Sequence, residues 1–181
     1  MKTHFVPRQI DYDGTQIHSL WAYREFGVQG DSIVAFQGGC DIPSGNMVDL
    51  EDVLAGSRIA SPLMLHFIAE HFDRDLEKAV LRQRLLAAIV RDELGGKVRR
   101  EGDDLFLGTG KLSISIATLT PVSSKIHFGI NIERALDVGV ETRALKDLDA
   151  DPPDLARRVV AQYASQIAGI HDARTRVRGV P

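Results

Sequence analysis

The apolar positions of this chain repeat with two different periods, and the clearest repeats are helical. Between residues 75 and 94 the apolar side chains recur every three or four positions, which is the spacing of one face of an α-helix. That stripe consists of Leu81, Leu85, Leu86, Ile89 and Val90. Gly95-Gly96 then supplies a stop signal. A second helix is expected after Asp151, where two prolines precede the stripe Leu155, Val159, Tyr163, Ile167 and Ile170.

The patterns that predict secondary structure before residue 75 are shorter. Residues 18–26 and 32–36 are rich in aromatic and apolar residues and are separated by glycines, which predicts two strands and a turn. Residues 37–46 contain three glycines and a proline, which predicts a loop. Residues 63–72 are apolar on almost every side and follow Ser61-Pro62, a typical helix start, so they predict a buried helix.

Three antiparallel strands are expected between the two long helices. They cover residues 103–107, 111–119 and 126–132, and Gly108-Thr109-Gly110 forms the first turn. Because side chains alternate between the two faces of a strand, the apolar residues are expected to share one face of the sheet. They are Leu112, Ile114, Ile116, Ile126, Phe128, Ile130 and Ile132. The whole pattern predicts an α+β fold, a central and mostly antiparallel sheet flanked by helices, in a single domain over residues 1–181.

The opposite face of this hairpin region is the predicted ligand site. It carries small or hydrogen-bonding residues, namely Lys111, Ser113, Ser115, Ala117, His127, Gly129 and Asn131. A solvated face usually carries longer side chains, so these residues favour a hollow that accepts a ligand. The expected register places Ser115 opposite Asn131 and Ala117 opposite Gly129. The alternative is an ordinary solvated sheet face.

The composition narrows the class of protein. The formal net charge of −3 argues against nucleic acid as a partner. The single cysteine, Cys40, excludes an intrachain disulfide and a cysteine zinc cage, which indicates a reducing compartment. Neither a signal peptide nor an apolar run of membrane-spanning length is seen, so a cytoplasmic location and no membrane partner are expected. His66 and His71 are five residues apart rather than four, so no obligatory metal is expected.

The glycine-rich segment is a second predicted part of the site. Gly38 and Gly39 can offer backbone N–H groups to a ligand, or they can form only a turn. Cys40 beside them is either a thiolate nucleophile or, more commonly for a lone cysteine, a small buried apolar residue.

Longer stretches of the chain resemble a known family. The stretches Trp21-Ala22-Tyr23-Arg24, Phe36-Gln37-Gly38-Gly39-Cys40-Asp41, Met64-Leu65-His66-Phe67-Ile68, Gly102-Asp103-Asp104-Leu105-Phe106 and 111–131 together resemble the uncharacterised domain-of-unknown-function family 366. The resemblance covers nearly the whole chain.

A more distant resemblance suggests chemistry. A strand with Asp-Leu, a glycine turn, Lys-Leu-Ser-Ile-Ser-Ile and Ile-His-Phe-Gly-Ile-Asn-Ile is similar to the lipoate and biotin protein ligase superfamily, whose fold is that of class II aminoacyl-tRNA synthetase cores. By this resemblance Lys111 is the catalytic residue that contacts the acyl carbonyl and phosphate of an acyl-adenylate. His127, Gly129 and Asn131 would line the same pocket. The implied cofactor is ATP or another acyl donor, and the implied partners are a small molecule and an acceptor protein.

The chain departs from the ligases in the glycine-rich segment. The ligases have paired arginines ahead of three glycines, whereas this chain has Phe36-Gln37 before Gly38-Gly39-Cys40. Arg24 or Arg58 would have to supply the missing cation. An acyltransferase that takes a preactivated acyl group is therefore expected as readily as a ligase. The competing hypothesis is a non-catalytic domain that keeps the fold for ligand or partner binding, and the oligomeric state is not predicted.

Overall fold

A five-stranded mixed sheet forms the centre of the computed structural model, which describes residues 1–136 and 138–180. The strand order is β1-β2-β3-β8-β7; β1 and β2 are parallel and the other neighbours are antiparallel. The bounds are β1 Lys2–Phe5, β2 Ser32–Asp41, β3 Ala60–His71, β7 Ser113–Leu119 and β8 Ser124–Asn131. The expected α+β architecture with a mostly antiparallel sheet is confirmed.

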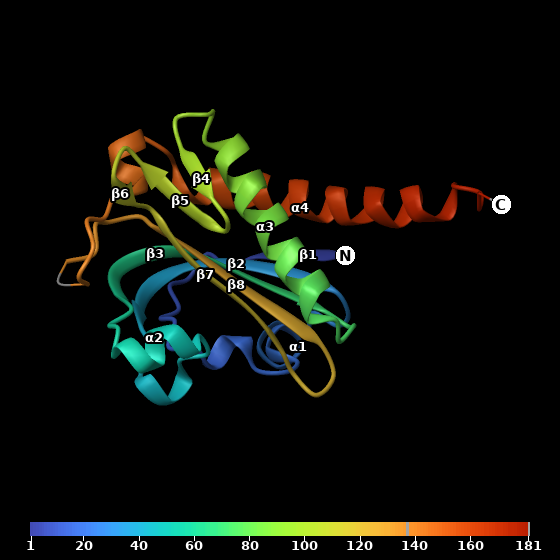
Figure 1. Cartoon of the computed structure of the whole chain (residues 1–181), viewed down its shortest axis with the longest axis horizontal. Coiled ribbons are helices and arrows are strands. Elements are labelled where there is room, and N and C mark those ends of the chain that lie inside the picture. The colour runs from blue at the N-terminus through green and yellow to red at the C-terminus, as the bar shows by residue number, and fades with distance from the viewer. Residues whose placement is uncertain (137, 181) are drawn as a thin grey trace.

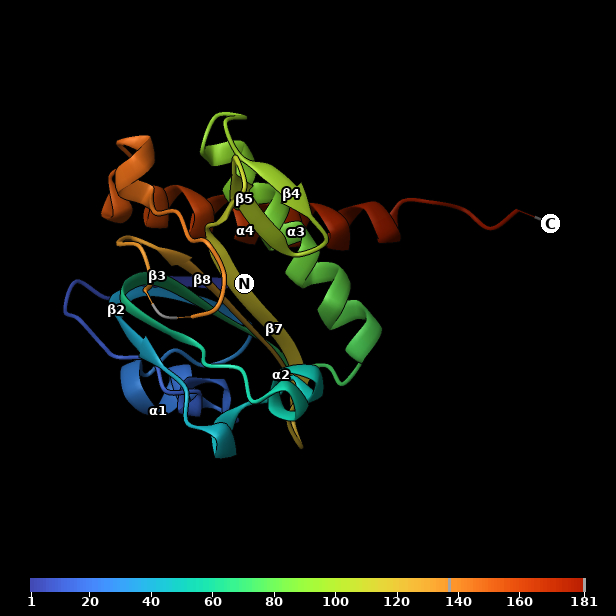
Figure 2. The same ribbon diagram turned by 60° about the vertical axis from the view of Figure 1, so that its left-hand side comes forward.

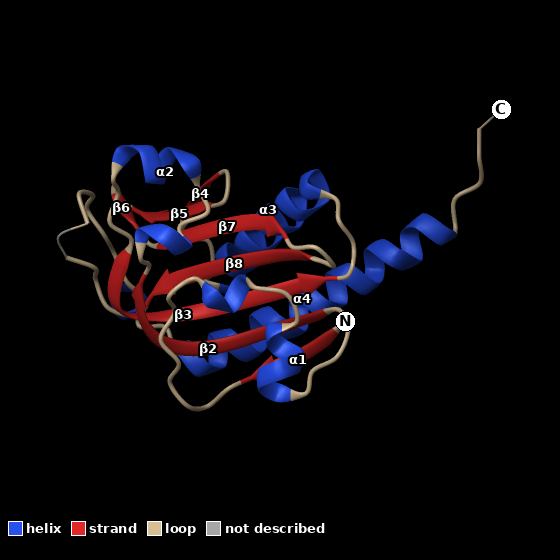
Figure 3. Cartoon of the chain, turned by 90° about the horizontal axis from the view of Figure 1, so that it is seen from below, coloured by secondary structure: helices blue, strands red, loops and turns tan. Residues whose placement is uncertain are grey.

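Helices cover both faces of this sheet. The long helices α3 (Leu76–Glu93) and α4 (Pro152–Thr175) lie on one face, and the short helices α1 (Trp21–Phe26) and α2 (Leu50–Ala55) lie on the other (Figures 1 and 3). Helix α3 packs on β7 and β8, and α4 packs on β1 and β2. The far end of α4 extends beyond the edge of the sheet (Figure 1). None of the helices in the described part of the chain combines the length and apolarity needed to span a bilayer.

A second, smaller sheet lies beside α3 (Figure 2) and carries the lysine of interest. It consists of β4 (Arg99–Glu101), β5 (Asp104–Leu107) and β6 (Gly110–Lys111). Three short 3-10 helices complete the described elements: η1 (Thr15–Ile17), η2 (Ser44–Asn46) and η3 (Leu145–Leu148).

Both predicted long helices are confirmed, including their first residues. Asp75 caps α3 by accepting a hydrogen bond from the Lys78 backbone N–H, at 2.9 Å, and Asp151 caps α4 in the same way. Most of each predicted stripe is buried against the sheet. Leu81 and Ile170 are the exceptions, since 61% and 50% of their surfaces are exposed.

The prediction of a buried helix over residues 63–72 is wrong, because this segment is strand β3. It occupies the middle of the sheet, where one face meets α3 and α4 and the other faces α1. Leu65 and Phe67 pack in the apolar core between the sheet and the long helices α3 and α4. Met64 and Ile68 pack in a second apolar core on the opposite face, which includes residues of α1. A strand buried on both faces is apolar at nearly every position, so its alternation disappears. Residues 18–26 are also not a strand, since Trp21–Phe26 form helix α1.

The predicted loop over residues 37–46 is wrong at its start, because β2 continues to Asp41 through a register shift between Gly38 and Cys40. The glycines serve a close approach rather than a turn. A Cβ atom at Gly38 would lie 1.9 Å from the carbonyl oxygen of Ile10, since the preceding segment crosses directly over this strand.

The expected register of the hairpin is also wrong. Ser115 lies opposite Phe128 rather than Asn131, and Ala117 lies opposite Ile126. Leu112 lies between β6 and β7, where the chain passes from the small sheet to the large one, and the alternation slips there by one residue. A slip of one residue exchanges the two faces of a strand, so Ser113 and Ser115 face the long helices.

Candidate functional site

The largest grouping of the predicted site residues surrounds a cavity of about 390 Å³, hereafter the main cavity. Its lining comes from α2, the β6–β7 edge, and the residues Ala135, Val138, Val140 and Thr142. Four of the predicted residues line it, Lys111, Ser113, Ser115 and Asn131. The structure thus brings these four together, although the register that was expected to do so is not the observed one.

Lys111 is held in the cavity wall from both sides. Its backbone N–H donates to Glu141 O at 2.9 Å, and its carbonyl accepts from the Arg143 N–H at 2.9 Å. Its ammonium Nζ lies 2.8 Å from Asp104 Oδ2, and each of the two side chains is 32% exposed. The positive charge is therefore fixed at the cavity but shared with a carboxylate.

Two polar residues that the sequence did not assign to the site also line the main cavity. Arg58 forms no ion pair with any described residue, so its guanidinium is a second cation at this site. The buried hydroxyl of Ser61 has no hydrogen-bond partner within the described residues. The only signal for Arg58 was the need to replace the missing arginines, and Ser61 had been interpreted as a helix cap.

Carboxylates dominate the charge of the main cavity. The acidic residues in its lining are Asp49, Asp52, Asp103 and Asp104. Against Lys111 and Arg58 they leave the described lining with a net formal charge of −2. Burial, together with the charge of the neighbouring Asp104, raises the pKa of Asp103 above its ordinary value.

The other predicted residues in this wall are engaged inside the protein. Ser113 Oγ accepts from the Leu105 backbone N–H at 2.9 Å. Gln83 of α3 donates through Nε2 to Ser115 Oγ at 2.7 Å and to Asp103 Oδ2 at 2.8 Å. Asn131 Nδ2 donates to the Arg143 carbonyl at 3.1 Å. These side chains shape the cavity, and Lys111 is the predicted residue that brings charge to it.

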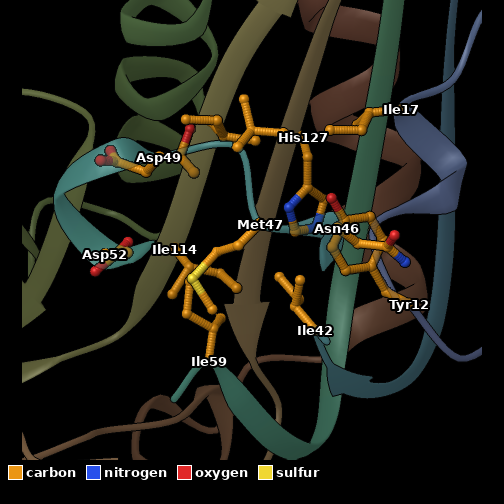
Figure 4. Close-up of a pocket in the computed structure, with 13 residues that line it drawn as sticks. Tyr12, Ile17, Ile42, Asn46, Met47, Asp49, Asp52, Ile59, Ile114 and His127 are labelled. Atoms are coloured by element: carbon orange, nitrogen blue, oxygen red, sulfur yellow. The ribbon is translucent and has the colours of Figure 1, made fainter. Parts of the chain in front are cut away.

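A second and smaller cavity, hereafter the His127 cavity, adjoins the main one and measures about 50 Å³. The two share the lining residues Asp49, Asp52, Ile59, Ile114 and Ser115. The ring of Tyr12 lies against the imidazole of His127 on one side, and Ile59 and Ile114 lie on another (Figure 4). His127 therefore lies in a neighbouring compartment rather than beside Lys111.

His127 belongs to a chain of buried polar groups. Its ring stacks on Tyr12 with centroids 3.7 Å apart, and its Nε2 lies 3.0 Å from His66 Nδ1. His66 Nε2 in turn lies 3.3 Å from the Gly38 carbonyl oxygen. Burial lowers the pKa of both histidines, that of His66 to about 4, so both rings are neutral near pH 7. His66 lies in the segment that was predicted to be a helix, but the structure places it on strand β3.

The predicted glycines serve packing in this structure. The Gly39 N–H donates to Asp11 Oδ1 at 2.9 Å, so a neighbouring side chain already uses it. A Cβ atom at Gly129 would come within 3.0 Å of Met64 Cε and 3.3 Å of His127 Nε2, so the missing side chain makes room for both side chains. Gly38 supplies the carbonyl that the His66 ring meets.

Cys40 lines a third cavity, of about 310 Å³, together with Arg58 and Ser61. Only 3% of its surface is exposed, and burial raises the pKa of its thiol to about 12. The thiol is therefore protonated near pH 7. Within the part of the chain that the structure describes, no three His, Cys, Asp or Glu side chains are grouped as a metal site requires.

Sequence comparison matches residues 1–178 to the family model Domain of unknown function (DUF366). An uncharacterized protein from Methanocaldococcus jannaschii is 38% identical over 180 residues, which covers 92% of this chain and 80% of that protein. A solved protein of unknown function from Pyrococcus horikoshi shares 37% identity and superposes with a TM-score of 0.95, with both chains fully covered.

More distant solved structures share the fold. A biotin protein ligase from Aquifex aeolicus in complex with biotin and ATP is 14% identical, with a TM-score of 0.58 over 91% of this chain and 69% of that one. A proposed lipoate protein ligase from T. acidophilum with bound lipoic acid is also 14% identical, with a TM-score of 0.56 over 92% and 86% of the two chains. The fold is therefore that of biotin and lipoate protein ligases.

Proposed function

The chain belongs to the DUF366 family, and on this premise we propose that its main cavity binds a small organic anion as part of an acyl- or adenylate-handling reaction. The anion is an acyl carboxylate or an acyl group activated as a mixed anhydride with phosphate. The observation that carries the proposal is the position of Lys111, whose ammonium is fixed in the wall of a cavity large enough for such a molecule.

Lys111 suits this role because an ammonium stabilises negative charge on an acyl carbonyl oxygen or on a phosphate. Arg58 lines the same cavity and adds a planar guanidinium, which can hold two oxygens at once. The unpartnered hydroxyl of Ser61, within the described residues, is a further donor beside them. On the same fold, the Aquifex enzyme is seen in complex with biotin and ATP, which supports a small-molecule site here.

The carboxylates of the main cavity argue against the triphosphate of free ATP. A lining with a net charge of −2 repels a polyanion more strongly than it repels a single carboxylate. This observation favours a second candidate function, a transferase or binding domain that takes a monoanionic or preactivated acyl compound without a nucleotide.

Thermal melting with Mg-ATP separates the two candidates. A ligand that binds the folded state stabilises it by RT ln(1 + [L]/Kd), about 2.7 kcal/mol at a hundredfold excess over Kd. We expect almost no rise in melting temperature at millimolar Mg-ATP. A saturable rise would restore the ATP-dependent ligase as the first candidate.

The anion site itself is tested by calorimetry with straight-chain acids from hexanoate to decanoate, alongside mass spectrometry of any small molecule that co-purifies. A charge-assisted hydrogen bond contributes about 1.5–3 kcal/mol, so Lys111→Ala should weaken binding roughly ten- to hundredfold. Lys111→Arg keeps the charge, and Lys97→Ala removes an exposed lysine as the matched control. Unchanged affinity in Lys111→Ala would remove the proposed site.

A further inference from the structure

We propose that the His127 cavity binds the far end of the same ligand, and that this end is a small group with an N–H or O–H hydrogen-bond donor. The inference rests on the proposed function for the anionic end only. It adds the chemical identity of the other end, and it assigns His66 as a positioning residue for His127.

The Gly38 carbonyl oxygen can only accept a hydrogen bond, and this fixes which ring nitrogens of His66 and His127 donate. The Gly38 carbonyl oxygen has no proton, so His66 Nε2 must carry one to bond it. A neutral imidazole has a single N–H, so His66 Nδ1 is an acceptor. His127 Nε2, 3.0 Å away, must then be the donor in that pair.

The same logic leaves His127 Nδ1 with a free lone pair. The residue is 2% exposed, it lines the small cavity, and Nδ1 has no hydrogen-bond partner among the described residues. No protein group occupies this acceptor, so a ligand that donates a proton to Nδ1 gains a hydrogen bond by binding there. Asp49 and Asp52, which line both cavities, are acceptors as well and disfavour an anionic group at this end.

The dimensions limit the group that fits. A cavity of about 50 Å³ holds a few waters or a group of about that size, such as a hydroxyl, a primary amide or an amine. Ile42, Met47, Ile59 and Ile114 supply most of the apolar surface of this cavity, and Tyr12 and the polar Asn46 lie beside His127 (Figure 4). The group must therefore be carried on an apolar chain that passes from one cavity to the other.

The strand geometry sets the length of that chain. Ile116, which pairs with His127, lies five residues beyond Lys111, and this span is at most about 16 Å at the usual rise along a strand, because the chain passes between two sheets at Leu112. The Lys111 ammonium pairs with Asp104, on the side of Lys111 that leads toward Ser113, so the two polar ends of the ligand lie closer together than this span. The substrate class is therefore an acid of medium length with a terminal hydroxyl, amide or amine, rather than a plain fatty acid.

Nitrogen NMR of the histidine rings tests the inference without the ligand. In 15N-labelled protein, His66 and His127 should both be protonated at Nε2, and the Nδ1 resonance of His127 should shift with acetamide but not with acetone. Acetone has the same number of heavy atoms and lacks the N–H donor. In His66→Phe the Nε2–H form of His127 should no longer be fixed. A proton on His127 Nδ1, or equal shifts with the two probes, would overturn the inference.

Calorimetry with matched acids tests the substrate class. Each ω-hydroxy acid of six, eight or ten carbons is compared with the unsubstituted acid one carbon longer, in which a methyl group replaces the hydroxyl. At the length that reaches His127, the hydroxy acid should bind about two- to tenfold more tightly, the range of one neutral hydrogen bond. His127→Phe should abolish that preference, whereas His171→Phe on the exposed side of α4 should keep it.

The outcomes separate the two proposals. If both members of each pair bind equally at every length and Lys111→Ala weakens both, the anion site stands and the inference about His127 fails. If no acid binds, the proposed function fails, and the NMR comparison of acetamide with acetone decides the inference about the His127 cavity.

Discussion

Lys125 and Glu70 form an ion pair inside the protein, with Nζ 3.1 Å from Oε2 and both side chains essentially inaccessible to solvent. The second carboxylate oxygen accepts hydrogen bonds from Ser123 Oγ at 2.7 Å and from the Leu20 backbone N–H at 3.0 Å. Both oxygens of this buried carboxylate therefore have donors. Glu70 ties β3 to β8 and to the start of α1, on the same face of the sheet as the two paired histidines.

Removal of one partner from this ion pair should strongly lower the free energy of unfolding. Lys125→Met leaves Glu70 charged and unpaired in the interior, and such a change costs about 3–5 kcal/mol of unfolding free energy. The double variant Lys125→Met with Glu70→Gln should recover most of that loss, because no buried charge remains. Urea denaturation measures both.

An exposed pair gives the control for this prediction. Lys146 bonds Glu133, but both side chains are largely solvated. Lys146→Met should therefore lose no more than about 1 kcal/mol. A Lys125→Met variant as stable as Lys146→Met would show that Glu70 is hydrated or protonated in the native protein.

The buried histidines predict a loss of stability in acid. Burial lowers the pKa values of His66, His71 and His127, so the unfolded chain takes up their protons first as the pH falls below about 6.5. Each histidine should then lower the unfolding free energy by about 1.4 kcal/mol per pH unit, down to its own folded pKa, which is about 4 for His66. Asp103, whose pKa is raised, acts in the opposite direction near the acid end.

Urea titrations at pH 7, 6 and 5 measure this slope. His71→Phe should reduce the slope of unfolding free energy against pH by the contribution of one histidine. His171→Phe is the matched control, because His171 is exposed. A stability that does not change between pH 7 and 5 would mean that the three imidazoles take up protons as readily in the folded protein as in the unfolded chain.

The close approach at Gly38 predicts opposite effects for two glycine substitutions. Gly38→Ala would place a methyl group 1.9 Å from the Ile10 carbonyl oxygen, and should cost about 3 kcal/mol or more. Gly169 lies within α4, and a Cβ atom there would meet nothing within 4 Å, so Gly169→Ala should stabilise by about 0.5–1 kcal/mol. Melting curves of the two variants provide the comparison, and equal stabilities would contradict the observed crossing at Gly38.

Cys40 should be unreactive in the folded protein. Its thiol is buried and its pKa is raised to about 12, so the thiolate that reacts with iodoacetamide is scarce near pH 7. Intact-mass analysis should show no adduct in native buffer and complete alkylation in urea. Cys40→Ser should still fold and bind the ligand. A stoichiometric acyl adduct on native Cys40 would instead make it a nucleophile.

The sequence by itself determined the elements whose signals are local. The stripe in α3, its cap at Asp75 and the cap at Asp151 depend on neighbours within a few residues, and all were predictable. The turn at residues 108–110 is of the same kind. Lys111 was singled out because it follows that turn in a stretch that resembles a ligase family, and its role stays a prediction.

Only the tertiary structure decided the faces and partners of the strands. The apolar run in β3 is equally consistent with a buried helix, and its position between β2 and β8 settles the matter. The slip at Leu112 turned Ser113 and Ser115 toward the helices, and no local pattern marks it.

The His127 cavity is the clearest case of a feature that the sequence alone could not predict. His66 and His127 are 61 residues apart, and neither has a sequence motif that links it to the other. Their contact exists because β3 and β8 pair side by side with Gly129 leaving space for the ring. Which atoms of a long chain meet depends on strand order and register, and these are set by the burial of both sheet faces together rather than by any one segment.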